Sequence, residues 1–378
     1  ICLHNSVYPF FKKEEKEIRE YAKQKDGIEQ LEPWDVSYYQ VMMKKENFSL
    51  DTEAFRKYLP HTAVLDGFFS LLNKLYGITF KKIDDAKKWH PDVNYYDILD
   101  KDGSYIPSLY MDLFPRQGKR SGAFCDFPTR GYEKGDGKYL LPLGVIVANL
   151  SPKIDGVAHL SISDVETLFH EMGHVLNGIF GHIRYPTFSF LNFPFDFVET
   201  SSQLMENWVY ERETLDLIAH AGKIDAVPDD MFQCLKKSMT YHSANANMRQ
   251  LRFGNGDLEL HINFLKSGMK LDEFIETVNK EYDFEYPTQP LSIMRRFGHI
   301  FGFEGGYPSE YYSYKWSESI ECDAFEYFKE EGIFNSAIAD KFRKEVLEVQ
   351  NSKPCDEQYR AFRGRDADFG ALLRHDGL

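Results

Sequence analysis

The sequence reads Glu-Thr-Leu-Phe-His-Glu-Met-Gly-His from Glu166 to His174. His170 and His174 are four residues apart, close to one turn of an α-helix, so both imidazoles project from one face of a helix. Two imidazoles in this arrangement can supply two ligands of a tetrahedral zinc ion. Glu171 follows the first histidine, and its carboxylate can act as general base on a zinc-activated water. The pattern therefore predicts a hydrolytic zinc site on a helix.

The residues around this motif indicate that the helix is buried. Apolar side chains recur at helical spacing from Val165 to Ile179. Most chance matches to the motif are charged groups on a solvated helix surface, which these apolar flanks do not fit. Buried imidazole and carboxylate groups need partners, and a metal ion is a natural partner for them.

Two roles are open for Glu166. Ser163 and Glu166 have the spacing of a capping box, which predicts a helix that begins there with Ser163 as its N-cap. Glu166 also precedes His170 by four residues, so its carboxylate could instead orient that ring. We expect the helix to end near Gly181.

A third zinc ligand is expected from residues 196–208, which read as a second helix. A catalytic zinc site needs a third protein ligand and one position open to water. Glu199 and Glu206 are the candidates, and their spacing of seven residues can place both on one helix face. A glutamate on a helix is usually a solvated carboxylate. The apolar pair before Glu199 looks buried, which favours Glu199 as the ligand. Spacing alone leaves the choice open.

The composition fits a large folded region and limits its partners. The chain has 378 residues, of which 43% are hydrophobic, enough for a sizeable core. Its net charge of −14 argues against nucleic acid and anionic membrane surfaces as partners. No apolar run is long enough to span a bilayer. Five scattered cysteines without a C-x-x-C pair indicate a reducing compartment, such as the cytoplasm or the mitochondrial matrix.

The hydrophobic pattern divides the chain into three parts and predicts a mainly α fold. Residues 1–80 show helical periodicity, residues 81–150 form a small β-rich part, and residues 151–378 form a helical part that contains the zinc site. We expect the small β subdomain to lie beside the metal helix, where a sheet edge could bind an extended peptide.

Turn residues and apolar runs mark the strands of the β-rich part. Asp102-Gly103 and Asp136-Gly137 are hairpin signals. Residues 108–113 and 140–149 are the strand candidates, and the second is almost continuously apolar.

Further blocks of sequence occur downstream of the two helices. The first runs from Phe297 to Phe301, the second is Gly305-Gly306-Tyr307, and the third runs from Tyr311 to Glu318. Together with the motif at His170 and the segment 196–208, these blocks resemble the M3 family of zinc oligopeptidases, especially its thimet oligopeptidase and oligopeptidase A members. The C-terminal stretches 362–365 and 371–374 are also similar to this family, so the resemblance covers nearly the whole chain.

The resemblance implies a zincin-like fold, one zinc ion per chain and a role for seven side chains. The implied zinc ligands are His170, His174 and Glu199, the general base is Glu171, and the substrate-binding and oxyanion-stabilising residues are His299, Tyr307 and Tyr314. A tyrosine hydroxyl suits the last role, because a tetrahedral intermediate needs donors aimed at its negative oxygen.

The resemblance also implies the extent of the catalytic region and its substrates. Residues 1–378 correspond to the C-terminal catalytic part of the family, and the channel-forming region of the family precedes the part that corresponds to Ile1. We expect a zinc metalloendopeptidase that hydrolyses short oligopeptides. The segment Phe188–Phe195 is more aromatic than the matching loop of the family, and residues 302–304 lengthen the connection between His299 and Tyr307.

Two alternatives stay open. The first is a peptidyl-dipeptidase of the same family, which needs a cation to hold the substrate carboxylate, and Arg184, Arg295 and Arg296 are available for this. The second is a catalytically impaired, truncated peptidase scaffold that binds peptides or partners.

Overall fold

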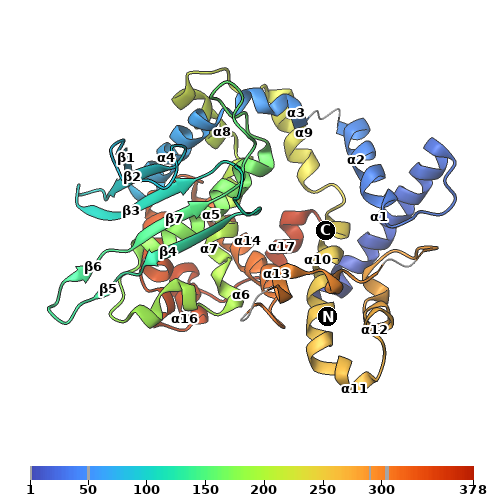
Figure 1. Ribbon diagram of the computed structural model, residues 1–378. Coiled ribbons are helices and arrows are strands. Elements are labelled where there is room, and N and C mark those ends of the chain that lie inside the picture. Colours follow the sequence, from blue (N-terminus) through green and yellow to red (C-terminus); the bar gives the residue numbers. More distant parts are fainter. Residues whose placement is uncertain (1, 49–51, 289–290, 303–305) are drawn as a thin grey trace. The chain divides into compact units, whose positions relative to one another are not determined.

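A computed structural model of the chain describes residues 2–48, 52–288, 291–302 and 306–378 (Figure 1). The chain divides into two compact units, each built from separate stretches of sequence. Unit 1 comprises Ile1–Leu50, Gln233–Trp316 and Leu372–Leu378, and unit 2 comprises Asp51–Phe232 and Ser317–Ala371. Both units are mainly helical, and unit 2 also holds a small sheet, so the predicted mainly α fold with a small β part is confirmed.

The helices are distributed over both units. Those mostly in unit 1 are α1 (Cys2–Asp26), α2 (Asp35–Phe48), α9 (Asp229–Met239), α10 (Ser243–Glu259), α11 (Leu265–Ser267), α12 (Leu271–Val278), α13 (Gly298–Phe301) and α17 (Gly370–Asp376). Those mostly in unit 2 are α3 (Thr52–Phe55), α4 (His61–Tyr76), α5 (Ile162–Phe180), α6 (Phe195–Val198), α7 (Thr200–Glu206), α8 (Arg212–Gly222), α14 (Ser313–Glu331), α15 (Ser336–Phe342) and α16 (Cys355–Arg363). In the described part of the chain, no helix combines the length and apolar character needed to cross a membrane.

The core of unit 1 forms where α1 packs against α10. Val7, Phe11 and Ile18 recur on one face of α1 and are buried against Ala244 and Met248 of α10. This helical spacing of apolar residues is the pattern that buries one face of a helix.

The sheet of unit 2 has five strands in the order β1-β2-β3-β7-β4. These strands are β1 (Thr79–Lys82), β2 (Asn94–Leu99), β3 (Tyr105–Asp112), β7 (Leu143–Val147) and β4 (Phe124–Thr129). Strands β3 and β7 pair in parallel, and the other pairs are antiparallel. A separate hairpin consists of β5 (Tyr132–Glu133) and β6 (Tyr139–Leu140). Strand β4 is therefore an edge strand, and one of its sides pairs with no other strand of the described residues.

The strand and turn predictions are confirmed. Asp102-Gly103 connects β2 to β3, and Asp136-Gly137 connects β5 to β6. Both glycines have φ of +79°, a left-handed conformation that glycine adopts without steric cost. The candidates 108–113 and 140–149 overlap β3 and β7.

Helix α5, which carries the His-Glu-x-x-His motif, packs on β7, β4 and α7. Two glycines allow this close packing. A Cβ atom on Gly173 would lie 2.5 Å from the carbonyl oxygen of Ser201 in α7, and one on Gly178 would lie 2.0 Å from the ring of Phe127 in β4. Because Gly173 lies between His170 and His174, the helix is pressed against α7 at the level of the motif.

The predicted capping box of α5 is wrong by two residues. Ser161 is the N-cap: its Oγ accepts from the backbone N–H of Asp164 at 3.0 Å, and the Asp164 carboxylate accepts from the N–H of Ser161 at 2.8 Å. The pair Ser161 and Asp164 has the same spacing as Ser163 and Glu166, and Ser163 already lies inside the helix. The predicted end near Gly181 is confirmed, since α5 ends at Phe180.

A buried carboxylate fixes the end of β3. Asp112 is only 2% exposed and accepts hydrogen bonds from both terminal nitrogens of Arg116 at 2.6 and 2.7 Å. It also accepts from Nε1 of Trp89 at 2.9 Å and Nζ of Lys119 at 3.0 Å. Burial alone would raise the pKa of Asp112, but these donors outweigh burial and lower the pKa to about 2.

We expect Asp112→Asn to destabilise the chain in a pH-dependent way. The pKa of Asp112 is lowered on folding from 3.8 to about 2. The ionised carboxylate therefore stabilises the fold above about pH 4, and this contribution is lost as the pH falls from about 4 to about 2. The substitution should lower the free energy of unfolding by about 2 kcal/mol at pH 7 and by clearly less at pH 2.5. Urea denaturation at both pH values measures this difference.

The matched control for this experiment is Asp136→Asn in the exposed β5–β6 turn. It should leave the free energy of unfolding nearly unchanged at both pH values. An equal loss at pH 7 and pH 2.5 for Asp112→Asn would contradict the account.

Candidate metal centre

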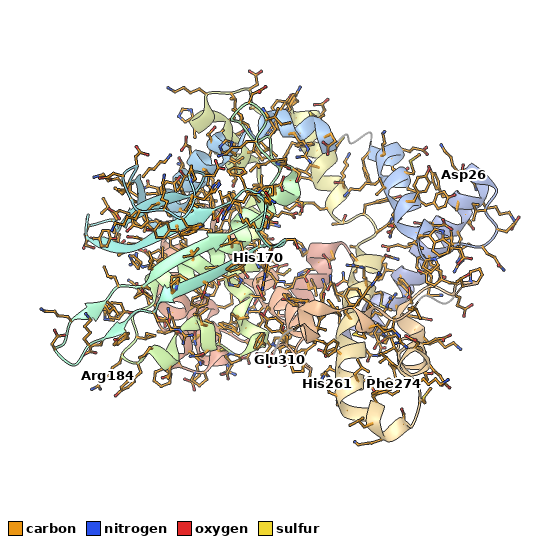
Figure 2. All side chains as sticks on the ribbon, viewed as in Figure 1. Asp26, His170, Arg184, His261, Phe274 and Glu310 are labelled. Carbon is orange, nitrogen blue, oxygen red and sulfur yellow. The ribbon has the colours of Figure 1, made fainter. Side chains whose placement is uncertain are left out.

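Unit 2 brings together three of the predicted zinc ligands. His170 and His174 project from α5, and Glu199 lies at the break between α6 and α7. Figure 2 labels His170 on α5. The ligand atoms of the three residues all lie within 4.8 Å of one another. Oε2 of Glu199 is 3.3 Å from Nε2 of His170 and 3.2 Å from Nε2 of His174.

These distances fit a zinc ion. Zinc binds imidazole nitrogen and carboxylate oxygen at about 2.0–2.1 Å, so two tetrahedral ligand atoms lie about 3.3 Å apart. Two histidines and one glutamate leave the fourth tetrahedral position open, which is typical of catalytic rather than structural zinc sites. Nδ1 of His174 and Oε2 of Glu171 are buried and have no hydrogen-bond partner among the described residues.

Glu199 reaches the histidines because the second predicted helix is interrupted. Helix α6 ends at Val198 and α7 begins at Thr200, with Glu199 between them. Oγ of Ser202 donates to Oε2 of Glu199 at 2.7 Å and to its carbonyl oxygen at 2.9 Å, which fixes the side chain. Burial raises the pKa of Glu199, but the two histidines outweigh burial and hold the pKa well below its usual value. The carboxylate is therefore ionised, as a zinc ligand must be.

Glu206, the other candidate ligand, contacts the opposite side of the His170 ring. Nδ1–H of His170 donates to Oε1 of Glu206 at 2.6 Å. This bond fixes the tautomer that leaves Nε2 free for a metal ion. Burial lowers the pKa of His170, whereas Glu199 and Glu206 raise it, and the carboxylates prevail.

In the structure Glu166 is bonded to Tyr210 and is not the carboxylate that orients His170. Its Oε1 accepts a hydrogen bond from the hydroxyl of Tyr210, and Glu206 is the carboxylate found at Nδ1 of His170. Glu206 comes from α7, so only tertiary structure reveals which of the two carboxylates orients the ring.

Glu171 has the surroundings of a general base. Glu171 is 5% exposed. Burial raises the pKa of its carboxyl group, while the nearby His170 and His174 lower it. A carboxylate with a raised pKa and an oxygen free of hydrogen bonds can accept a proton from water. Strand β4 lies beside it: burial raises the pKa of Cys125 in β4, and the charge of Glu171 raises it further.

The remaining predicted residues form a cluster within unit 1. The hydroxyl of Tyr314 is 3.3 Å from Nε2 of His299, and the ring centroids of His299 and Tyr307 are 5.2 Å apart. Tyr311 packs against His299 and Tyr314, and its hydroxyl donates to Oε1 of Gln250 at 2.8 Å. The catalytic roles of His299, Tyr307 and Tyr314 stay predictions. Gly305 and the lengthened connection at 303–304 lie outside the described residues.

We expect Glu206→Gln to weaken zinc binding without abolishing it. The neutral amide no longer supports the charge-assisted bond to Nδ1 of His170, and such outer partners change metal affinity by about 10–100-fold. Competition with a chromogenic chelator measures the dissociation constant. Glu213→Gln on the exposed surface of α8 is the matched control and should bind zinc like the unchanged chain. Equal affinities for Glu206→Gln and the unchanged chain would contradict this role.

Comparisons with known proteins relate the chain to one family of peptidases. A sequence model of peptidase family M3 matches residues 1–378. Oligopeptidase A of Escherichia coli K12 is 34% identical over 376 residues, which cover 98% of this chain and 55% of that protein. Dipeptidyl carboxypeptidase of Salmonella typhimurium is 30% identical over 372 residues, covering 97% of this chain and 54% of that protein. The chain thus spans about half the length of these curated relatives.

A solved structure supports the fold alone. PZ peptidase A with inhibitor 2 superposes with a TM-score of 0.51 at 16% sequence identity, covering 98% of this chain and 57% of that one. The match of the family model over the whole chain, together with relatives above 30% identity, decides the family. This chain belongs to peptidase family M3.

Proposed function

We propose that this chain contains the catalytic centre of a zinc metalloendopeptidase that hydrolyses short oligopeptides. The observation that carries the proposal is the position of Glu171 next to the His170, His174 and Glu199 cluster, with one buried carboxylate oxygen that has no partner among the described residues. Family membership and the similarity to proteins named oligopeptidase A support the substrate class.

Each side chain of the centre has a distinct task in this proposal. His170, His174 and Glu199 hold one zinc ion, which when bound polarises the scissile carbonyl and the attacking water. Glu171 accepts the proton of that water at its free oxygen and then delivers it to the leaving amine. Glu206 keeps the His170 ring in position through Nδ1.

The edge strand β4 is the proposed track for the peptide. One side of β4 pairs with no other strand of the described residues, and β4 packs against α5, the helix that carries Glu171. An extended peptide can pair with such an edge through main-chain hydrogen bonds. This mode of binding requires an extended peptide segment, which a short, unfolded substrate supplies readily.

We also propose that His299, Tyr307 and Tyr314 act on the substrate. Hydroxyl and imidazole N–H groups can donate to the negative oxygen that develops during attack on a peptide bond. The 3.3 Å contact between Tyr314 and His299 lets one side chain orient the other.

A peptidyl-dipeptidase is the second candidate, and one relative named dipeptidyl carboxypeptidase favours it. This activity needs a cation that is free to bind the carboxylate of the substrate. Arg295 is engaged, since Asp272 accepts from its Nε and terminal nitrogen at 2.6–2.9 Å. Arg184 and Arg296 have no ion pair with any described residue. Mass spectra of the products from one peptide of about ten residues separate internal cleavage from dipeptide release.

We propose a reducing compartment for the chain. None of the five cysteines forms a disulfide in the described part of the chain, which suits an environment that keeps thiols reduced. Plant relatives are named both as cytosolic and as organellar oligopeptidase A.

We expect Glu171→Gln to abolish hydrolysis and to retain zinc. Loss of a general base lowers kcat by about a hundredfold to ten-thousandfold, whereas glutamine leaves the metal ligands intact. A quenched fluorescent peptide of about eight residues measures the rate, and atomic emission measures zinc per chain. A chelator should stop the unchanged chain, and added zinc should restore it.

Two results would contradict the proposal. Undiminished hydrolysis by Glu171→Gln would remove Glu171 from the mechanism. A chain that retains zinc but cleaves no peptide would favour the impaired scaffold over an active peptidase.

A further inference from the structure

One loop of unit 2 connects two of the proposed zinc ligands. Residues 184–195, here called the aromatic loop, follow α5 with His174 and lead through α6 to Glu199. The loop contains two short turns of 3₁₀ helix, Pro186–Phe188 and Phe190–Asn192. Its residues Phe188–Phe195 are the segment expected from the sequence to be more aromatic than the matching loop of the M3 family.

The aromatic loop is firmly anchored to its surroundings. Gln350 is 3% exposed: its Nε2 donates to the carbonyl oxygen of Asn177 in α5 at 2.7 Å, and its Oε1 accepts from the backbone N–H of Phe190 at 3.1 Å. Nδ2 of Asn351 donates to the carbonyl oxygen of Asn192 at 2.7 Å. The loop therefore presents its side chains from a fixed backbone.

The rings of this loop fall into two groups. Phe190 is buried, with its centroid 5.3 Å from that of Phe127 in β4 and 6.4 Å from that of His174. Tyr185 and Phe188 instead are 51% and 40% exposed, with ring centroids 6.0 Å apart. Adjacent exposed rings on a fixed backbone lose little conformational entropy on binding, which makes them suitable for contact with a ligand.

The exposed rings lie beyond one end of the proposed peptide track. Phe127 of β4 packs against Gly178, two residues before the end of α5, and Phe127 and Arg130 line the same small cavity as Ser189 and Leu191 of the aromatic loop. The end of β4 and the end of α5 therefore lie beside the aromatic loop. The aromatic loop follows the end of α5, and the N–H of Glu133 in β5 donates to the carbonyl oxygen of Ile183 at 3.2 Å. This bond holds the start of the loop beside the strand that follows β4.

We propose that Tyr185 and Phe188 form a subsite for a bulky apolar side chain of the peptide substrate. The inference rests on the proposed peptidase function and names the substrate feature that this loop selects. An extended peptide rises about 3.3 Å per residue, so a side chain held at the far end of β4 lies several residues from the cleaved bond.

Arg184 bears on the choice between an apolar and an acidic side chain. Its guanidinium lies over the ring of Tyr185, 5.3 Å from the centroid. This stacking supports one face of the ring and leaves the exposed surfaces of Tyr185 and Phe188 for an apolar ligand, while the guanidinium keeps its N–H donors. An acidic side chain is the competing occupant, and the experiment includes it.

The test uses ten-residue peptides with one scissile bond and Phe, Ala or Glu placed three, four or five residues from it on either side. For the unchanged chain we expect kcat/KM to be about tenfold higher for Phe than for Ala at one of these positions. Phe188→Ala should bring that ratio close to one by lowering kcat/KM for the Phe peptide. Phe188→Tyr keeps the ring and should keep the preference.

Two controls separate this inference from the function on which it rests. Ile154→Ala removes another exposed apolar side chain, 75% exposed and outside the loop, and should leave the ratio unchanged. Binding of the same peptides to Glu171→Gln, followed by fluorescence anisotropy, reports the preference without turnover and should show the same dependence on Phe188.

The outcomes are distinct. Cleavage or binding without a preference for Phe, or with a preference that survives Phe188→Ala, overturns the subsite and leaves the peptidase proposal standing. A preference for Glu overturns it in favour of Arg184 as the selecting group. No cleavage by the unchanged chain and no binding to Glu171→Gln would overturn both.

Discussion

The close approach of α5 and α7 at Gly173 is the constraint on which the metal centre depends. A side chain at this position would lie 2.5 Å from the backbone of Ser201, so only glycine lets the two helices meet. This contact lies between the two histidines and two residues after Glu199. It brings Oε2 of Glu199 to 3.2–3.3 Å from both imidazoles, the spacing that a tetrahedral zinc ion requires.

The same contact concentrates charge in a buried place. Glu171, Glu199 and Glu206 lie around His170 and His174. The carboxylates of Glu199 and Glu206 raise the pKa of His170 above its usual value. Burying so many ionisable groups is costly unless each has a partner. Without a metal ion the negative charge of the carboxylates is balanced by protons on the histidines, and a bound divalent cation takes over this role. Glu206 completes the arrangement through Nδ1 of His170, and the free oxygen of Glu171 stays available for chemistry.

Local patterns revealed the elements of this site, and tertiary distances assigned their roles. The His-Glu-x-x-His spacing, the apolar flanks and the Asp-Gly turns predicted the metal helix and the hairpins, because each depends only on neighbouring residues. Glu199 and Glu206 are seven positions apart, so helical spacing alone did not distinguish them. In the structure Glu199, at the break after Val198, lies at Nε2 of both histidines, and Glu206 accepts from Nδ1 of His170. The N-cap was misplaced because two serines offer the same spacing, and the aromatic loop became informative only once burial separated Phe190 from Phe188.

The most direct measurement of the central claim is X-ray absorption at the zinc K edge of the chain loaded with one equivalent of zinc. The account predicts a first shell of nitrogen and oxygen at about 2.0–2.1 Å, with the outer-shell scattering of two imidazole rings. The same spectrum from Glu199→Ala should lose the carboxylate contribution or show no bound zinc. Sulfur ligands at about 2.3 Å, or a shell without imidazole, would contradict the assignment of His170, His174 and Glu199 as the metal centre.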